Sequence, residues 1–287
     1  MNTLNKTKII LNKYDIKANK RFGQNFLIDD NILENIVEVS NISKSDLVIE
    51  IGPGLGNLTE YIIERAGYTL LVEIDSKMIQ ILNDRFEDKE NYILLNDDIL
   101  KINLDEKIKE IEKELNIEFD KIKVVANLPY YITTPILFKL LQDESRIDSI
   151  TVMVQKEVAE RMVAHSKTKD YGILTLMVKY LSDSNIEFIV PRESFIPAPN
   201  VTSAIINLKK NKKYSVTNEK LFFELIHKSF AKRRKTMINS LYLSNFNGMD
   251  KEILNDIFNK VGIEKNIRAE ELEIDDYIKI TDAINNM

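Results

Sequence analysis

The sequence Leu47-Val-Ile-Glu-Ile-Gly-Pro-Gly-Leu-Gly56 decides the fold, because it joins a short apolar run to a cluster of three glycines. Residues 57–65 then repeat apolar side chains at helical spacing, with Leu58, Tyr61 and Ile62 on one face. Glycine lets the backbone turn tightly and pass close to a ligand. Ligands of open α/β sheets bind at the carboxyl ends of the strands. The stretch therefore predicts a strand, a glycine loop and a helix, with a binding site beside residues 52–56.

Two further apolar runs end in carboxylates. Residues 68–72 end at Glu73, in the position where a carboxylate can accept bonds from both hydroxyls of a ribose. Residues 91–95 lead into Asp98, which could accept a bond from an adenine amino group. Asp98 could equally cap a helix or close an Asx turn. Together with the glycine loop, the two carboxylates predict a nucleoside cofactor.

The glycine pattern favours S-adenosylmethionine over a dinucleotide as that cofactor. The dinucleotide fingerprint places its third glycine one position later, where this chain has Asn57. S-adenosylmethionine has no pyrophosphate for such a loop to bind. We therefore expect S-adenosylmethionine beside Gly52 and Gly54.

A second motif, Asn127-Leu-Pro-Tyr130, follows an apolar run over residues 122–126 that predicts another strand. The Asn127 amide oxygen and the Leu128 carbonyl could accept the two N–H groups of an adenine N6 while the base stacks on Tyr130. An amino nitrogen conjugated to a purine is a weak nucleophile, so the site must orient it and accept its hydrogen bonds in the transition state. The motif thus predicts methylation of an amino group, although Asn and Pro are also ordinary turn residues.

Composition narrows the class of protein. The 287 residues are 44% hydrophobic and 30% charged, which is typical of a globular chain. No apolar stretch of membrane-spanning length and no signal peptide is evident, so we expect a cytoplasmic protein with no membrane partner. The absence of cysteine excludes disulfides and thiolate chemistry, and with only His165 and His227 we expect no metal site.

The net charge of −5 argues against a nucleic-acid binder, because such proteins usually carry a basic excess. Basic residues are nevertheless concentrated locally, near residues 17–21, over residues 209–213 and over residues 232–235. Each group could also be an ordinary solvated surface. The residues that we expect to bind RNA phosphates are Lys232, Arg233, Arg234 and Lys235.

Strand and helix patterns alternate up to residue 208, which predicts a parallel, doubly wound sheet. The lysine-rich residues 209–218 resemble a linker, and only helical patterns follow from Glu219 onward. We therefore predict a Rossmann-like domain over residues 1–208 and a small helical RNA-binding domain over residues 209–287. A monomer is expected, because no coiled-coil heptads stand out.

Eight motifs, taken in order, resemble the bacterial small-subunit (16S) rRNA adenine N6,N6-dimethyltransferases. They are Arg21-Phe-Gly-Gln-Asn-Phe-Leu27, Glu50-Ile-Gly-Pro-Gly-Leu-Gly56, Glu73, Asp98, Asn127-Leu-Pro-Tyr130, Gln155-Lys-Glu-Val-Ala-Glu-Arg161, Phe195-Ile-Pro-Ala-Pro-Asn-Val201 and Phe230-Ala-Lys-Arg-Arg-Lys-Thr236. The resemblance implies dimethylation of N6 of two adjacent adenines near the 3′ end of 16S rRNA, with S-adenosylmethionine as methyl donor. It also implies immature 30S ribosomal subunits as the partner and a role in their biogenesis.

The same resemblance implies roles for individual residues. Asn127 and Tyr130 would hold the target adenine, and Phe195 would stack on its other face. The residues that would contact the cofactor are Asn25, Leu27, Gly52, Glu73, Asp98 and Asn127. Tyr131 stands where the family usually has Asn, which puts the dimensions of the pocket in doubt.

Three alternatives stay open. A resistance-type 23S rRNA adenine methyltransferase shares the cofactor motifs, but it usually has Ile in place of Leu128 and lacks the continuation over residues 134–139. A non-catalytic ribosome-assembly factor could retain the fold, although intact Asn127, Glu73 and Asp98 argue against it. A DNA amino-methyltransferase is the third.

Overall fold

The computed structural model describes residues 1–16 and 23–287, so Phe22 and the whole basic group at residues 17–21 lie outside the described residues. The chain forms two compact units. Unit 1 contains residues 1–159 and 184–210, and unit 2 contains residues 160–183 and 211–287. This division differs from the predicted one in residues 160–183 and 209–210. Within residues 160–183, Tyr171, Leu176 and Tyr180 pack with the C-terminal helices.

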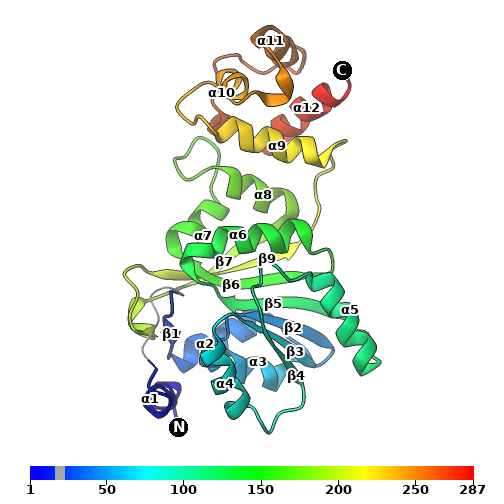
Figure 1. Cartoon of the computed structure of the whole chain (residues 1–287). Helices are drawn as coiled ribbons and strands as arrows, with labels where there is room; N and C mark the ends of the chain where they lie inside the picture. Colours follow the sequence, from blue (N-terminus) through cyan, green and yellow to red (C-terminus); the bar gives the residue numbers. More distant parts are fainter. Residues whose placement is uncertain (17–22) are drawn as a thin grey trace. The chain divides into compact units, whose positions relative to one another are not determined.

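A seven-stranded sheet with the order β4-β3-β2-β5-β6-β9-β7 is the centre of unit 1 (Figure 1). Its strands are β2 (Asp46–Ile51), β3 (Tyr68–Glu73), β4 (Tyr92–Asn96), β5 (Lys121–Asn127), β6 (Ser149–Gln155), β7 (Ser182–Val190) and β9 (Ser203–Lys210). All six residues of β2 are buried, as expected for a central strand with helices on both faces. The α/β fold class predicted from the sequence is confirmed.

The sheet is mixed, so the prediction of a wholly parallel sheet is wrong at one edge. Strands β2 to β6 pair in parallel, whereas β9 pairs antiparallel with β6. The connection from β7 to β9 contains only the short helix η4 (Arg192–Ser194) and the two-residue strand β8 (Phe195–Ile196). A parallel pair needs a longer crossover, usually through a helix. Strand direction at this edge is therefore set by the connection, which the apolar pattern of the strands does not reveal.

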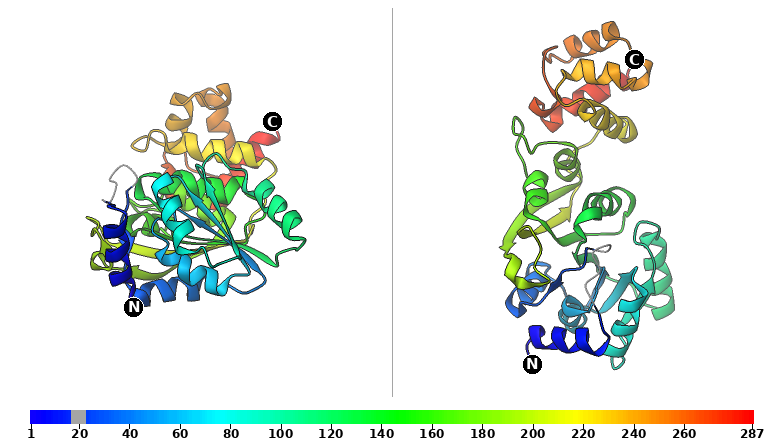
Figure 2. Two further views of the ribbon diagram at one scale, coloured as in Figure 1. Left: turned by 60° about the horizontal axis from the view of Figure 1, so that its bottom comes forward. Right: turned by 60° about the vertical axis from the view of Figure 1, so that its left-hand side comes forward.

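Helices cover both faces of this sheet (Figure 2). They are α2 (Asp30–Val39), α3 (Asn57–Arg65), α4 (Ser76–Arg85), α5 (Leu104–Leu115), α6 (Thr133–Phe138), which continues as the π-helix η3 (Lys139–Asp143), and α7 (Lys156–Met162), whose last residues belong to unit 2. Asp29, Asp75 and Asn103 cap α2, α4 and α5 by accepting bonds from backbone N–H groups of the first turn.

Three elements of unit 1 were not predicted. Helix α1 (Thr3–Lys13) is mostly polar, and only its short apolar run gave a signal. Strands β1 (Phe26–Leu27) and β8 are two residues long and pair antiparallel with each other, with Leu27 opposite Phe195. Strands this short carry no periodic pattern, because a period of two residues needs several repeats to be seen.

Unit 2 is helical, with a core built from aromatic side chains. Its helices are α8 (Ile173–Leu181), α9 (Glu219–Phe230), α10 (Met237–Leu243), η5 (Phe246–Gly248), α11 (Lys251–Lys260), η6 (Ala269–Glu271) and α12 (Ile274–Asn285). Tyr180 of α8 packs on Phe222 of α9 with ring centroids 4.7 Å apart, and Tyr277 of α12 is fully buried in the same cluster. This packing explains why residues 160–183 belong to unit 2.

No helix in the described part of the chain is both long and apolar enough to cross a membrane.

Candidate active site

A cavity opens at the carboxyl ends of β2 to β5 in unit 1. Its walls are the glycine loop (residues 52–56), the ends of β3 and β4, the target turn (residues 127–131) and the β1 wall (residues 23–27). The strand order reverses between β2 and β5, since β3 lies on one side of β2 and β5 on the other. Open α/β sheets bind their ligands at such a reversal.

The glycine loop presents its backbone to the cavity. Gly52 and Gly54 have φ angles of +66° and +56°, a region that strains other residues. The Gly52 N–H donates to the Val72 carbonyl at 2.9 Å, and the Gly54 N–H donates to Glu73 Oε2 at 3.0 Å. A side chain added at Gly52 would meet nothing within 4 Å. The loop is therefore fixed from behind and open in front, as a ligand-binding loop must be.

Glu73 ends β3 and is buried beside this loop. Its two carboxylate oxygens accept backbone N–H bonds, Oε2 from Gly54 and Oε1 from Asp75 at 2.8 Å. Burial raises the pKa of Glu73, and these two backbone bonds partly oppose that shift. A carboxylate has about four acceptor positions, so both oxygens can still accept a further hydroxyl.

Asp98 follows β4 and lines the same cavity. Its Oδ1 accepts the Leu100 N–H at 3.0 Å, which is the local turn that the sequence left as an alternative. Its Oδ2 lies 4.0 Å from Lys101 Nζ, and the side chain is 28% exposed. The turn uses one oxygen while Asp98 lines the cavity, so the two interpretations of Asp98 are compatible.

Asn127 is the last residue of β5, and its amide has a defined orientation. Nδ2 donates to the Asn25 carbonyl at 3.3 Å, while the Asn25 side chain donates to the Gly23 carbonyl at 3.0 Å. Because Nδ2 has an acceptor, the amide oxygen of Asn127 is the group available to accept a bond from a ligand. Leu128 is anchored by its own N–H, which donates to the Met153 carbonyl at 3.2 Å.

The remaining residues of the target turn are Pro129 and two tyrosines. The Tyr130 hydroxyl lies 2.6 Å from Ser203 Oγ, which fixes the ring, and burial raises the pKa of Tyr130. The Pro129 carbonyl accepts from the Thr133 hydroxyl at 3.0 Å, so the short helix η2 (Tyr130–Ile132) is tied to α6. Tyr131 also lines the cavity but is 58% exposed. It therefore stands at the mouth and does not fill the interior.

The structure brings together most of the residues predicted for the site. Those that line the cavity are Asn25, Leu27, Gly52, Gly54, Glu73, Asp98, Asn127 and Tyr130. Phe195 is not among them; it is 3% exposed and packs in the apolar cluster that contains Leu27 and Val190. The stacking of Phe195 on a base stays a prediction, because Phe195 does not line the cavity in this structure.

Glu50, Asn57 and Ile74 also line the cavity, and no role was predicted for them. Glu50 in β2 is buried and accepts the Thr59 hydroxyl bond at 2.6 Å, and burial raises the pKa of Glu50 to about 8. Its signal was a carboxylate inside an otherwise apolar strand. Asn57 follows the glycine loop, and Ile74 follows β3 with 51% of its surface exposed.

The basic run of unit 2 lies in the turn between α9 and α10, and all four residues are exposed. Arg233 differs from its neighbours, because its Nε pairs with Glu270 at 2.8 Å and its guanidinium also donates to the carbonyls of Lys169 and Tyr171. Arg233 therefore has a structural role within unit 2, whatever else the run binds.

No group of three or more His, Asp or Glu side chains that could hold a metal ion occurs within residues 1–16 and 23–287.

A mixed sheet of this order, with a glycine loop after its first long strand and carboxylates after the next two, defines a Rossmann-like methyltransferase. The chain belongs to the ribosomal RNA adenine dimethylase family, whose sequence profile matches residues 15–286. It is an rRNA adenine N6,N6-dimethyltransferase of a family that depends on S-adenosylmethionine. The family and the enzyme class predicted from the motifs are confirmed.

Individual relatives agree with this assignment. The chain is 44% identical to ribosomal RNA small subunit methyltransferase A of Clostridium botulinum (strain Okra / Type B1), covering 97% of this chain and 98% of the relative. It is 45% identical to the protein of the same name from Alkaliphilus oremlandii (strain OhILAs), covering 95% of this chain and 93% of the relative.

Two solved structures share the fold of this chain. A dimethyladenosine transferase from Plasmodium falciparum superposes with a TM-score of 0.76 at 27% identity, covering 91% of this chain and 98% of that one. The 23S rRNA methyltransferase ErmE shares the fold, with a TM-score of 0.64 at 22% identity over 91% of this chain and 100% of its own.

Proposed function

We propose that this enzyme dimethylates N6 of two adjacent adenines near the 3′ end of 16S rRNA in immature 30S subunits and so takes part in small-subunit biogenesis. The observation that carries the proposal is the Asn127 amide, fixed at the end of β5 in the same cavity as Glu73 and the glycine loop. The names of the relatives, which specify the small ribosomal subunit, support this substrate over 23S rRNA. Such a substrate is consistent with the cytoplasmic location expected from the sequence.

The cavity residues fit S-adenosylmethionine. Glu73 would accept the ribose hydroxyls, Asp98 the adenine amino group, and Gly52 and Gly54 would face the ligand with their backbone, where the space beside Gly52 is open. Asn25 and Leu27 supply the opposite wall. When bound, the cofactor supplies a methyl group activated by the sulfonium, so the protein need not provide a leaving group.

The target turn would bind the adenine. The Asn127 amide oxygen and the Leu128 carbonyl would accept the two N6 hydrogens, and Tyr130 would stack on the base, with a contribution of about 1–3 kcal/mol. These acceptors orient the nitrogen lone pair and stabilise the positive charge that forms on nitrogen during transfer. The positively charged N6 is acidic and loses its proton to solvent water, so no strong general base is needed. The second methylation uses one N–H bond fewer.

RNA phosphates are the proposed ligands of the basic run. Lys232, Arg234 and Lys235 are exposed and carry no intramolecular salt bridge within the described part of the chain, unlike Arg233. Reversing the charge of these three while keeping Arg233 should weaken 30S binding and flatten its salt dependence, because fewer counterions are released. Cofactor affinity should not change. Wild-type salt dependence in this variant would show that the run is only a solvated surface.

The direct test is methyl transfer from labelled S-adenosylmethionine to purified 30S particles, 50S precursors and duplex DNA. We expect incorporation into 30S particles only, with N6,N6-dimethyladenosine found by mass spectrometry of the nucleosides. Incorporation into 50S precursors or DNA would support one of the alternatives instead. Sedimentation of the free enzyme would test the expected monomer in the same preparation.

A further inference from the structure

Helix α1 lies behind two walls of the cavity. The apolar side chains of Ile10 and Leu11 pack against a cluster that contains Phe26 of the β1 wall and Leu55 of the glycine loop. Both Phe26 and Leu55 line the cavity on their other side. The matched family profile begins at residue 15, so α1 precedes it. A helix outside the shared motifs therefore supports two of the surfaces that those motifs form.

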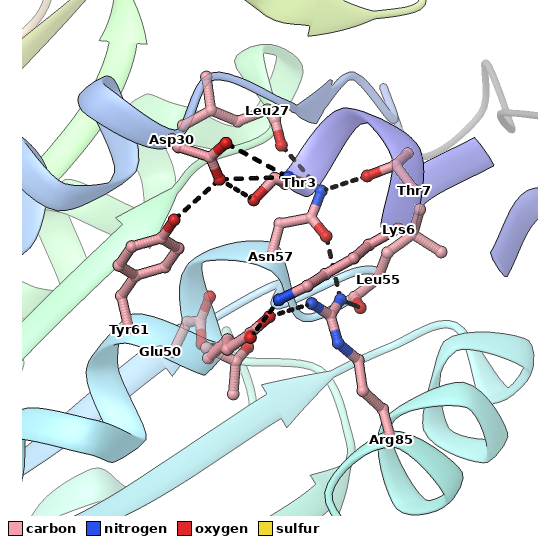
Figure 3. A network of polar contacts seen from close by, with 12 residues as sticks. Thr3, Lys6, Thr7, Leu27, Asp30, Glu50, Leu55, Asn57, Tyr61 and Arg85 are labelled. Atoms are coloured by element: carbon pink, nitrogen blue, oxygen red, sulfur yellow. Dashed lines mark hydrogen bonds and ion pairs between the residues drawn. The ribbon is translucent and has the colours of Figure 1, made fainter. Parts of the chain in front are cut away.

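Asn57 connects this helix to both walls (Figure 3). Its Nδ2 donates to Thr7 Oγ1 of α1 at 2.9 Å and to the Leu27 carbonyl of the β1 wall at 2.8 Å. Its Oδ1 accepts from Arg85 of α4 at 3.0 Å, and the same guanidinium nitrogen donates to the Leu55 carbonyl at 2.5 Å. Thr7 is fully buried, and Asn57 is 5% exposed.

Two ion pairs and a cap complete the attachment of α1. Glu60 of α3 pairs with Lys6 at 2.5 Å and with Arg85 at 2.6 Å, so one carboxylate joins α1 to α4. At the start of α1, the Thr3 N–H and hydroxyl donate to Asp30 of α2 (Figure 3). Thr3 and Thr7 are four residues apart and thus share one face of the helix. That buried polar face is the reason the helix gave no apolar pattern in the sequence.

The β1 wall has little strand pairing to support it. Strand β1 is two residues long, and its strand partner in the described part of the chain is β8, which is equally short. An isolated two-stranded ribbon is marginally stable in water. The bond from Asn57 to the Leu27 carbonyl adds to the apolar packing of Phe26 and Leu27 in ordering this wall. A ligand that meets an ordered wall loses less conformational entropy on binding.

We propose that α1 is a positioning element of the cofactor site, which acts through Thr7 and Asn57 to order the β1 wall and the glycine loop and thereby strengthens cofactor binding. The inference rests on the proposed placement of the cofactor in this cavity. Neither Thr7 nor Lys6 lines the cavity, so their effect on cofactor affinity is exerted through Asn57, Glu60 and Arg85.

The test uses full-length Thr7→Val, which preserves the shape of the side chain and removes the acceptor for Asn57. Calorimetry with S-adenosylmethionine and with S-adenosylhomocysteine should show Kd raised about three- to tenfold, the effect of one lost internal hydrogen bond. Turnover on 30S particles at saturating cofactor should stay within about twofold of wild type. Thr7→Ser, which retains the hydroxyl, should restore the wild-type Kd.

Tyr61→Phe is the matched control. The Tyr61 hydroxyl donates to Asp30 in the same network at 2.9 Å, but neither residue lines the cavity. This variant should lower the Tm without a change in cofactor Kd. Lys6→Met, a second variant of α1, should raise the Kd as Thr7→Val does. If Thr7→Val and Lys6→Met lower the Tm but leave the Kd unchanged, α1 serves stability alone and the inference is wrong.

The outcome for the wild-type enzyme separates this inference from the proposed function. A wild-type enzyme that binds S-adenosylmethionine and methylates 30S particles, together with unaffected α1 variants, would overturn only the role of α1. A wild-type enzyme that fails to bind either cofactor form would overturn the placement of the cofactor, and with it the inference.

Discussion

The glycine loop and the target turn face the same cavity, but the protein supports them differently. Behind the glycine loop, Gly54 is bonded to Glu73, and Asn57 and Arg85 tie the loop to three helices. The Asn127 side chain, in contrast, has one bond at 3.3 Å. The glycine loop is thus held mainly by side chains of helices, whereas the target turn is held by the Leu128 N–H, the Tyr130 hydroxyl and the Thr133 hydroxyl.

Asn127→Ala should have the largest effect, because it removes a bond that matters only in the transition state. The loss of a buried bond of about 1–3 kcal/mol corresponds to roughly a ten- to two-hundred-fold lower turnover. Single-turnover methylation of 30S particles measures it, with filter binding to verify that RNA affinity is retained. Near wild-type turnover would mean that the target turn does not activate the base.

Glu73→Gln should have the next largest effect, and it should appear in cofactor binding. A bond to a charged group contributes about 1.5–3 kcal/mol, so we expect the Kd for S-adenosylmethionine to rise about ten- to one-hundred-fold. Asp98→Ala should weaken the same ligand. If calorimetry showed an unchanged Kd for S-adenosylmethionine in both variants, the ends of β3 and β4 would not be the part of the cavity that binds the cofactor.

Glu50→Gln should change how stability depends on pH. Burial raises the folded-state pKa of Glu50 from 4.5 to about 8, so the folded protein retains a proton that the unfolded chain loses at a lower pH. The stability contributed by this proton is complete below pH 4.5 and is lost as the pH rises through about 8. Urea unfolding of cofactor-free protein should show wild-type stability falling by at most about 1.4 kcal/mol per pH unit in this window. Glu50→Gln should flatten that slope, and an identical slope in both proteins would contradict the buried-acid assignment.

Tyr131→Asn should have the smallest effect on the cofactor side. Because the ring is 58% exposed at the mouth of the cavity, its replacement should change the Kd for S-adenosylmethionine less than about threefold. Calorimetry of this variant beside Glu73→Gln compares the two sides directly. A change as large as that of Glu73→Gln would show that Tyr131 shapes the cofactor pocket after all.

Much of the site could be predicted because its residues follow strands that the sequence makes obvious. Each apolar run over residues 47–51, 68–72 and 122–126 is a strand in the structure, and in a parallel sheet the carboxyl ends of such strands meet at one edge. Gly52, Glu73 and Asn127 could therefore be placed together from their positions alone. The start of α2 is equally local, since Asp29 caps this helix.

The tertiary structure decided what depends on contacts between distant residues. The burial of Phe195 follows from the pairing of β8 with β1, in which Phe195 lies opposite Leu27 although the two residues are 168 positions apart. Residues 160–183 belong to unit 2 because their aromatic side chains pack on α9. The role of Arg233 follows from Glu270. None of these contacts has a period or a motif, because each depends on complementary shape and charge.

The α/β class, the family and the strand ends that form the cavity follow from local patterns of apolar residues, glycines and motifs, so they can be predicted from the sequence alone. The antiparallel β9, the composition of unit 2 and the attachment of α1 to the glycine loop depend on contacts that form only in the folded chain. Thr7 and Asn57 are ordinary polar residues in the sequence, 50 positions apart. They become significant because folding buries both, and a buried polar group must find its hydrogen-bond partner within the protein.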